Sequence, residues 1–198
     1  MSIIVKGVAS YPNVFEAKAN PLNPNATPKF SLTILVDKNT EEGRATMAAY
    51  KKQLDLVARE KCKKPYADVY IPDDDRKGFL DGDGKAGRKS KTGEKIAGYE
   101  GMWVIKASSA DRISVVDHQL KLLVAQDGKV YGGCIVNAVI NPYYTENGGS
   151  AGFFNGLEAV QVVGSGQRFG RAPVDVNSVF AEVEYEGDED LPFDDGDV

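Results

Sequence analysis

The sequence has little of what nucleophilic enzymes and secreted proteins use. It contains one histidine, His118, and two cysteines, Cys62 and Cys134, which lie far apart in the chain. Two such cysteines do not suggest a disulfide framework. A Cys–His nucleophile pair would need His118 beside one of them, and nothing in the sequence indicates this. We therefore expect no catalytic residues and no cofactor.

Long apolar runs are also absent, so no stretch could span a bilayer as a helix. The N-terminal residues 1–6 are too short for the core of a signal peptide, and a lysine interrupts them. We expect a soluble cytoplasmic protein that has no membrane partner.

Two glycine- and aspartate-rich stretches come close to known motifs without matching them. Residues 82–90 resemble a Walker A loop, but Arg88 stands where the lysine should follow the second glycine. Aspartates at 73–75, 81 and 83 could bind a hard cation, as in a metal-dependent nuclease. They alternate with basic residues and lack EF-hand spacing, so we favour a solvated loop and predict no metal site.

Charge is strongly segregated along the chain. Residues 182–198 contain nine acidic residues and no basic one. The other 20 of the 29 acidic residues lie in 1–181 with all 24 Lys and Arg, so this body carries about +4 and the last segment −9. A basic body indicates a polyanionic partner. The acidic segment is expected to be disordered and either to aid solubility or to compete for the same basic surface.

The pattern of apolar residues predicts a mainly β protein. Residues 30–36 alternate, with Phe30, Leu32, Ile34 and Val36 on one face, as in a half-buried strand. Residues 85–95 hold five basic residues and one acid and are expected to form a mobile basic loop. Further strands are expected at 3–9, continuing as an extended segment to 18, and at 102–107, 120–125, 130–140 and 157–163.

One helix is expected, over residues 41–63. Asn39 with Glu42 three residues later would cap it, and Pro65 would end it. An apolar stripe at intervals of three and four runs along it, formed by Met47, Tyr50, Leu54 and Val57. Short strands, one helix and long loops predict an OB-fold-like Greek-key barrel over residues 1–181, followed by a disordered acidic tail over 182–198.

Aromatic and basic residues outside the clear core stripes give the best functional signal. Single-stranded nucleic acid is held by stacking bases on rings and by pairing phosphates with Lys and Arg, with about 1–3 kcal/mol for each stacked base. The predicted nucleic-acid-binding residues are Tyr11, Phe15, Lys18, Lys29, Tyr70, Arg76, Lys77, Lys89, Tyr99, Lys106, Tyr143, Tyr144, Phe153, Phe154 and Arg168.

Several short pieces in a fixed order resemble a known family. They are Ser10–Phe15, Pro28–Leu32, Leu80–Asp83, Val116–Asp117, Val130–Cys134, Gly152–Leu157 and Val160–Gln161, spread over residues 10–170. In this order they resemble the phage single-stranded DNA-binding family formerly labelled a domain of unknown function. The resemblance implies an OB barrel that coats single strands without strong sequence preference. It assigns no role to the basic loop 85–95, and it suggests that Asp81 and Asp83 fix a turn.

The acidic tail is similar to those of bacterial and T7-type single-strand binders. This similarity implies docking of replication or recombination proteins through Asp190, Leu191, Pro192, Phe193, Asp194 and Asp195. Phe193 would fill a pocket on the partner while the aspartates meet a basic rim. Here five residues follow Phe193, unlike tails in which the phenylalanine is terminal.

We therefore expect a non-enzymatic protein that binds single-stranded DNA in phage replication or recombination, in the cytoplasm of the host cell. A homodimer is possible from the sequence. The alternatives are a single-strand annealing recombination protein, a metal-dependent nuclease that uses Asp73–Asp83, and a structural protein of the virion.

Overall fold

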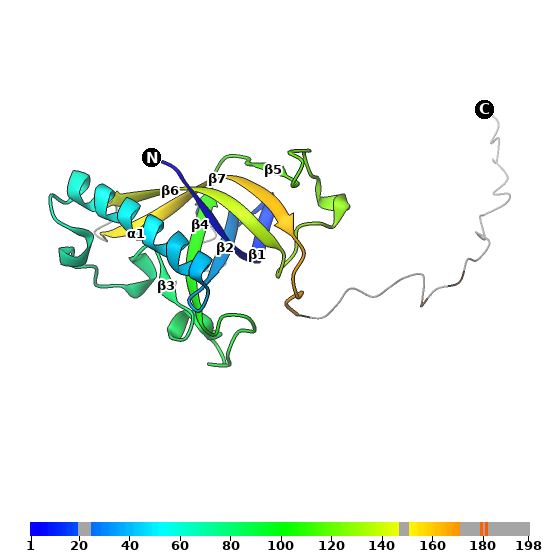
Figure 1. The fold of residues 1–198 in the computed structure, drawn as a ribbon, viewed down its shortest axis with the longest axis horizontal. Helices are drawn as coiled ribbons and strands as arrows, with labels where there is room; N and C mark the ends of the chain where they lie inside the picture. Colours follow the sequence, from blue (N-terminus) through cyan, green and yellow to red (C-terminus); the bar gives the residue numbers. More distant parts are fainter. Residues whose placement is uncertain (20–24, 147–150, 171–178, 180, 182–198) are drawn as a thin grey trace, which may run out of the picture.

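The computed structural model of the chain describes residues 1–19, 25–146 and 151–170, together with Val179 and Ala181 (Figure 1). The predicted tail residues at 190–195 lie outside these ranges. The elements in chain order are β1 (Ile3–Lys18), β2 (Lys29–Asp37), α1 (Glu41–Lys61), η1 (Tyr66–Asp68), η2 (Asp74–Arg76), β3 (Leu80–Asp81), η3 (Lys85–Gly87), β4 (Met102–Ser109), β5 (Ser114–Val116), η4 (Ala125–Asp127), β6 (Ile135–Thr145) and β7 (Gly152–Gly164).

Five strands close into a barrel. Strand β1 pairs antiparallel with β2 through its second half and with β6 through its first half, while β4 pairs with β2, and β7 with β6. A parallel contact between β4 and β7, at Ser108 and Gly156, completes the ring. The strand order around the barrel is β1–β2–β4–β7–β6, with β3 and β5 added outside it. The OB-fold-like barrel predicted from the sequence is confirmed.

Every second side chain of the barrel strands points inward, and these side chains fill the barrel. On β2, Leu32 and Ile34 are buried in the main core, as are Ile105 and Ala107 on β4. Leu35 faces the opposite side of β2 and is also buried, because Tyr99 and other residues that precede β4 cover it. The half-buried strand expected at 30–36 is therefore covered on both faces near its end.

Helix α1 packs against the barrel along one apolar stripe. Met47, Tyr50, Leu54 and Ala58 are buried, whereas the predicted Val57 is only partly so. The N-cap is Thr40 rather than the expected Asn39: the Thr40 hydroxyl accepts from the Gly43 N–H at 3.1 Å. The helix ends at Lys61, within two residues of the expected end.

Two strand predictions need correction. Residues 120–125 form no strand; Leu122 makes a single bridge to Val116, and Leu120 has a left-handed φ of 64°. The strand in this region is β5, three residues that pair parallel with β7 and that the sequence pattern did not reveal. Strand β6 begins at Ile135, not at residue 130.

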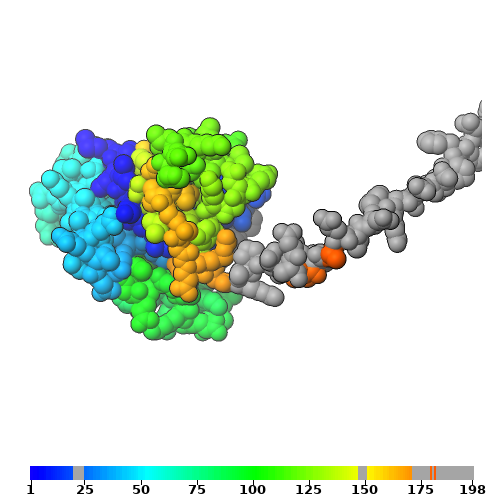
Figure 2. Space-filling model, turned by 45° about the vertical axis from the view of Figure 1, so that its right-hand side comes forward, coloured from blue at the N-terminus to red at the C-terminus, as the bar shows by residue number. Residues whose placement is uncertain are grey.

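Segments far apart in sequence meet at one end of the barrel. The residues before β4 and those after β7 lie side by side in Figure 2, in green and orange. Phe169 packs with the cluster of Leu35, Tyr99 and Val104, and it lies directly over Gly98. Among the described helices, none is long and apolar enough to cross a membrane.

Candidate nucleic-acid interface

The outward face of β2 and β4 forms the floor of a hollow of about 510 Å³, here called the strand hollow. Successive side chains of a strand point to opposite faces, so the burial of Leu32 and Ala107 places Ser31, Thr33 and Lys106 on the outward face. Thr33 on β2 pairs with Lys106 on β4. Lys29 lines the same hollow at the start of β2, opposite Lys18 on β1. This is the face that OB folds use to bind oligonucleotides.

Two rings stand at one end of the strand hollow. Tyr143 on β6 and Phe154 on β7 are cross-strand partners, with ring centroids 6.0 Å apart and planes 30° from parallel. Tyr143 is 42% exposed, and Phe154 lines the hollow. The pair therefore offers an aromatic surface on which a base could stack.

The neighbouring cross-strand pair, Tyr144 on β6 and Phe153 on β7, points toward the core. Phe153 is 1% exposed and packs against Tyr144 and Tyr66. Since successive side chains of a strand point to opposite faces, Phe153 and Phe154 cannot both face the ligand. The prediction that Phe153 stacks on bases is wrong for this reason, and Tyr144 is half-buried against the core.

A second hollow, of about 820 Å³, continues the first and is here called the hairpin hollow. Both are lined by Thr33, Asp75 and Lys106, so together they make one groove. One wall of the hairpin hollow is formed by residues 85–95, which we call the basic hairpin. Asp75 is the one acidic residue among the described residues that line the groove, and it lies 3.4 Å from Lys106.

The basic hairpin has a defined backbone. The N–H of Lys89 donates to the Glu94 carbonyl and the N–H of Gly93 to the Lys89 carbonyl, both at 2.8 Å. At its base the Ile96 N–H donates to the Gly87 carbonyl at 2.7 Å. Ile96 and Ala86 pack on the cluster of Leu35, Tyr99 and Val104. The hairpin is therefore attached to the barrel by apolar contacts at its base.

Tyr11 faces the basic hairpin from β1. It has a φ of 45°, lies at an irregularity of register between Ser10 and Asn13, and is followed by Pro12. A left-handed φ is uncommon outside glycine, and such strain costs about 1–3 kcal/mol. The Tyr11 side chain is 60% exposed and lines the hairpin hollow.

Tyr99, another predicted ring, lies beneath this hollow. It is 4% exposed, and its hydroxyl lies 3.1 Å from the Ser10 hydroxyl. Burial raises the pKa of this hydroxyl. The prediction that Tyr99 stacks on bases is wrong, because the ring supports the floor.

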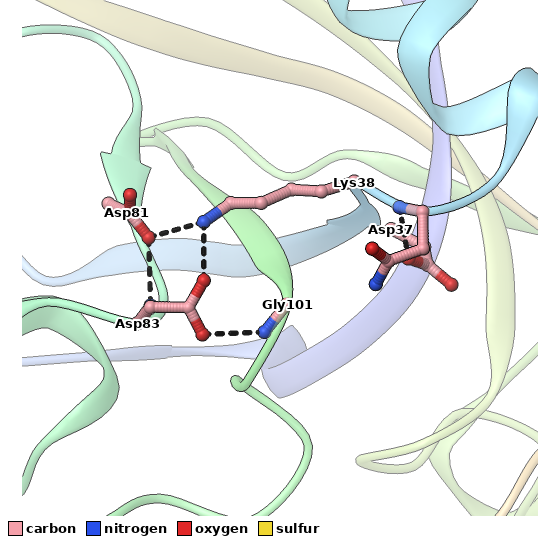
Figure 3. A network of polar contacts seen from close by, with 6 residues as sticks. Asp37, Lys38, Asp81, Asp83 and Gly101 are labelled. Atoms are coloured by element: carbon pink, nitrogen blue, oxygen red, sulfur yellow. Dashed lines mark hydrogen bonds and ion pairs between the residues drawn. The ribbon is translucent and has the colours of Figure 1, made fainter.

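Lys38 and two aspartates tie the segment between α1 and β4 to the barrel (Figure 3). The Lys38 ammonium donates to Asp81 and, at 2.7 Å, to Asp83. Asp83 also accepts from the Gly101 N–H at 2.7 Å, and Asp81 from the Asp83 N–H at 2.8 Å. The Gly101 N–H, followed by Lys38, lowers the pKa of Asp83. This geometry agrees with the prediction that Asp81 and Asp83 fix a turn.

The other aspartates of this segment are paired with bases in the same way. Asp74 lies 2.7 Å from Lys77, and Asp73 lies 3.4 Å from Arg76 while capping η2. In the ranges that the structure describes, no group of three or more His, Cys, Asp or Glu could hold a metal. The carboxylates that a nuclease would need are thus engaged by lysine and arginine.

Asn155 lies beneath the strand hollow and was missed in the sequence. It is 3% exposed; its amide nitrogen donates to the carbonyls of Gly78 at 2.8 Å and Lys106 at 3.0 Å. Its Oδ1 lies 2.9 Å from the Tyr50 hydroxyl, and burial raises the pKa of that hydroxyl. Asn155 therefore joins α1, β4 and β7 under the groove.

Several predicted residues lie outside the groove. Tyr70 is 84% exposed but does not line it, Phe15 packs against the core, and the Arg168 guanidinium lies 4.0 Å from the Tyr131 ring centroid. Lys77 pairs with Asp74. The structure brings together Lys29, Lys106, Tyr143 and Phe154 at the strand hollow and Tyr11, Lys89 and Lys106 at the hairpin hollow.

The chain is similar in fold to solved single-stranded DNA-binding proteins of phages. The single-stranded DNA-binding protein of bacteriophage Enc34, solved in complex with single-stranded DNA, is 25% identical, covers 85% of this chain and 89% of its own, and has a TM-score of 0.69. The single-stranded DNA-binding protein gp2.5 of bacteriophage T7 is 15% identical over 94% of this chain and 98% of its own, with a TM-score of 0.50, and supports the fold alone.

A curated relative, the putative protein p50 of Acyrthosiphon pisum secondary endosymbiont phage 1, is 39% identical over 72 residues. The match covers 36% of this chain and 39% of that relative, so it spans less than half of the relative's length. The family model described as the single-stranded DNA-binding protein of Enterobacter phage Enc34 matches residues 1–191. This protein belongs to the Enc34 single-stranded DNA-binding protein family.

Proposed function

We propose that this protein binds single-stranded DNA in the groove and coats exposed strands during phage DNA replication or recombination in the host cytoplasm. The observation that carries the proposal is the combination of Lys29, Lys106 and the Tyr143–Phe154 pair at one hollow on the β2–β4 face. The family consists of single-stranded DNA-binding proteins rather than enzymes, which supports a binding function.

The mechanism follows from these side chains. A phosphate would displace Asp75 from Lys106, whose ammonium lies 3.4 Å from that carboxylate at an exposed position. Lys29 has no carboxylate partner among the described residues and is ready to meet another phosphate. Stacking on Tyr143 and Phe154 accepts any base, because every base has a π face. The affinity is therefore expected to depend strongly on salt and weakly on sequence.

Fluorescence anisotropy with labelled oligo-dT, at low and high salt, tests this function. We expect tight binding at low salt, weaker binding at high salt, and weaker binding of a duplex at both. Phe154→Ala should lower the affinity about tenfold, through the loss of one stacking surface. Leu122→Ala removes an exposed side chain outside the groove and serves as the matched control.

Two results would contradict the proposal. The first is failure of the wild-type protein to bind oligo-dT in dilute buffer. The second is equal affinity of the Phe154→Ala and Leu122→Ala variants, which would place the strand elsewhere on the barrel. An assay of complementary-strand pairing tests the annealing alternative, which requires that the protein speed that pairing.

The acidic residues 182–198 support a second part of the proposal, the recruitment of replication or recombination proteins. Their nine carboxylates flank the apolar island Leu191–Phe193. A synthetic peptide of residues 182–198 should bind replication proteins of the same phage, and Phe193→Ala should weaken it. Equal binding of the two peptides would contradict the role of the phenylalanine. Self-association into a homodimer is a separate proposal, which light scattering without DNA would test.

A further inference from the structure

The basic hairpin contains the whole net positive charge of the body. Residues 85–95 hold five Lys and Arg and one Glu, a net charge of +4. Residues 1–181 together carry 24 basic and 20 acidic residues, so without the hairpin 19 of each remain and the body is neutral. The excess positive charge of the body therefore equals the charge of this one wall of the groove, which adds to the attraction that Lys29 and Lys106 exert on a polyanion.

The hairpin cations are available to a ligand. Lys85 and Lys91 are exposed, line the hairpin hollow, and form no salt bridge within 4 Å among the residues that the structure describes. Lys77 lowers the pKa of the Asp74 carboxyl, and the Lys85 charge lies close enough to add to this effect. Lys89 lies 2.8 Å from Glu94, within the hairpin itself. Because Ala86 and Ile96 anchor the hairpin base, these charges are held beside the barrel. A strand in the hollow would meet them without a large rearrangement.

The strained conformation of Tyr11 is held by a local contact, in which the Asn13 amide donates to the Tyr11 carbonyl at 3.3 Å, and not by burial of the ring. Its ring is 60% exposed, so the left-handed φ of 45° before Pro12 gains little buried surface for the fold. Irregularities of register re-aim side chains, and here Tyr11 lines the hairpin hollow together with Lys89. Strain at an exposed ring that faces a basic wall points to a ligand.

We propose that Tyr11 and the basic hairpin form a nucleotide-binding subsite that extends the groove beyond Lys106. A base stacks on the Tyr11 ring, and the phosphates beside it contact Lys85 and Lys91. The subsite rests on the proposed function, because it holds the same single strand that passes over β2 and β4. The hairpin thus acts as the second wall of the binding site and supplies much of its salt dependence.

Tyr11→Gly separates a role in binding from a role in folding. Glycine adopts a left-handed φ freely, so this variant should be as stable as the wild type or more so. Its affinity for labelled oligo-dT should nevertheless fall about tenfold. Tyr11→Phe keeps the ring and should retain the affinity.

The matched control is Leu120→Gly, which also replaces an exposed residue with a left-handed φ, 64°, but lies outside the groove. Thermal unfolding should show no loss of stability in either glycine variant, and only Tyr11→Gly should bind DNA more weakly. Equal affinity of the two variants would overturn the assignment of Tyr11.

The hairpin is tested by the salt dependence of binding. In the double variant Lys85→Gln and Lys91→Gln, the slope of log affinity against log salt should shrink by about 1.4, or about 0.7 for each lost phosphate contact. The control, Lys52→Gln with Lys64→Gln, removes the same charge from exposed positions that do not line the groove. Equal slopes in the two variants would overturn the role of the hairpin.

The outcomes for the subsite and for the proposed function are distinct. If the wild-type protein does not bind oligo-dT, both fail. If it binds, and Phe154→Ala weakens binding while the Tyr11 and hairpin variants behave as their controls do, the groove on β2 and β4 stands and the subsite alone is rejected.

Discussion

At the scale of single residues, Asn155 has the most connections beneath the groove. Asn155→Leu would take the side-chain donor from the Lys106 carbonyl and one of two side-chain donors from the Gly78 carbonyl, and it would leave the Tyr50 hydroxyl with Gly78 as its acceptor. A buried polar group left unpaired costs about 1–3 kcal/mol, so we expect the free energy of unfolding to fall by about 2 kcal/mol. Urea denaturation measures this.

Tyr50→Phe provides the comparison for Asn155. It removes only the hydroxyl, which also lies 2.9 Å from the Gly78 carbonyl, and should cost about 1 kcal/mol. If Asn155→Leu cost no more than Tyr50→Phe, the amide would not have the linking role that its contacts indicate.

The sequence identified residue types at this scale better than it identified their orientation. Phe153 and Phe154 are adjacent, and alternation requires that one of them face inward, but which one depends on register with β6. Tyr99 lies in a loop without periodicity, where no pattern separates a buried ring from an exposed one. Asn155 gave no signal, because a single polar residue in a strand is as easily solvated as buried.

At the scale of elements, the contacts of Lys38 predict how the segment between α1 and β4 is held. Lys38→Met removes the ammonium from Asp81 and Asp83. We expect faster amide hydrogen exchange around Asp81 and through the basic hairpin, with little change in the barrel strands. Lys52→Met is the matched control, since Lys52 is exposed on α1. Unchanged exchange in the Lys38 variant would show that apolar contacts alone hold the segment.

The same network predicts a dependence on pH. Lys38, followed by the Asp83 N–H, lowers the pKa of Asp81, and the Gly101 N–H, followed by Lys38, lowers that of Asp83. A carboxyl group with a lowered folded pKa stabilises the fold fully above its ordinary pKa of about 4, and this stabilisation is lost as the pH falls through the lower folded value. The difference in unfolding free energy between wild type and Lys38→Met should therefore shrink in acid. A constant difference from pH 7 to pH 2 would contradict this.

Regular elements were predictable where a periodic pattern of apolar residues extended over a long segment. The strand at 30–36 and the helix from residue 41 followed from alternation and from the apolar stripe, and both are confirmed. Strand β5 has three residues and exists because it pairs with β7, which is distant in the chain. The apolar residues at 120–125 predicted a strand wrongly, since Leu120 and Leu122 are more than two-thirds exposed.

At the scale of the whole molecule, the groove could not be assembled from the sequence. Its residues come from β1, β2, β4, the basic hairpin and the β6–β7 pair, which only the barrel topology brings together. The class of ligand was accessible because segregation of charge does not depend on topology. Basic residues that lie far apart in the sequence can line the same groove after the strands have formed the barrel.

The acidic segment gives a prediction for the molecule as a whole. Removing residues 182–198 changes the net charge from −5 to about +4, so repulsion between the protein and DNA becomes attraction. Affinity for oligo-dT should stay equal or rise, and most at low salt, because screening shortens electrostatic reach to about 10 Å at 0.1 M. Anisotropy titrations at two salt concentrations measure this.

A full-length variant in which the nine acids of residues 182–198 become Asn or Gln separates charge from the presence of the segment. If charge is the cause, this variant should bind DNA as the shortened chain does. A marked loss of affinity on deletion would contradict competition between the acidic segment and DNA. If the neutral variant instead bound DNA as the wild type does, while the shortened chain bound it more tightly, the segment would act by its bulk. If the acidic segment competes with DNA for the basic hairpin through its charge, the shortened chain and the neutral variant must bind DNA with the same affinity.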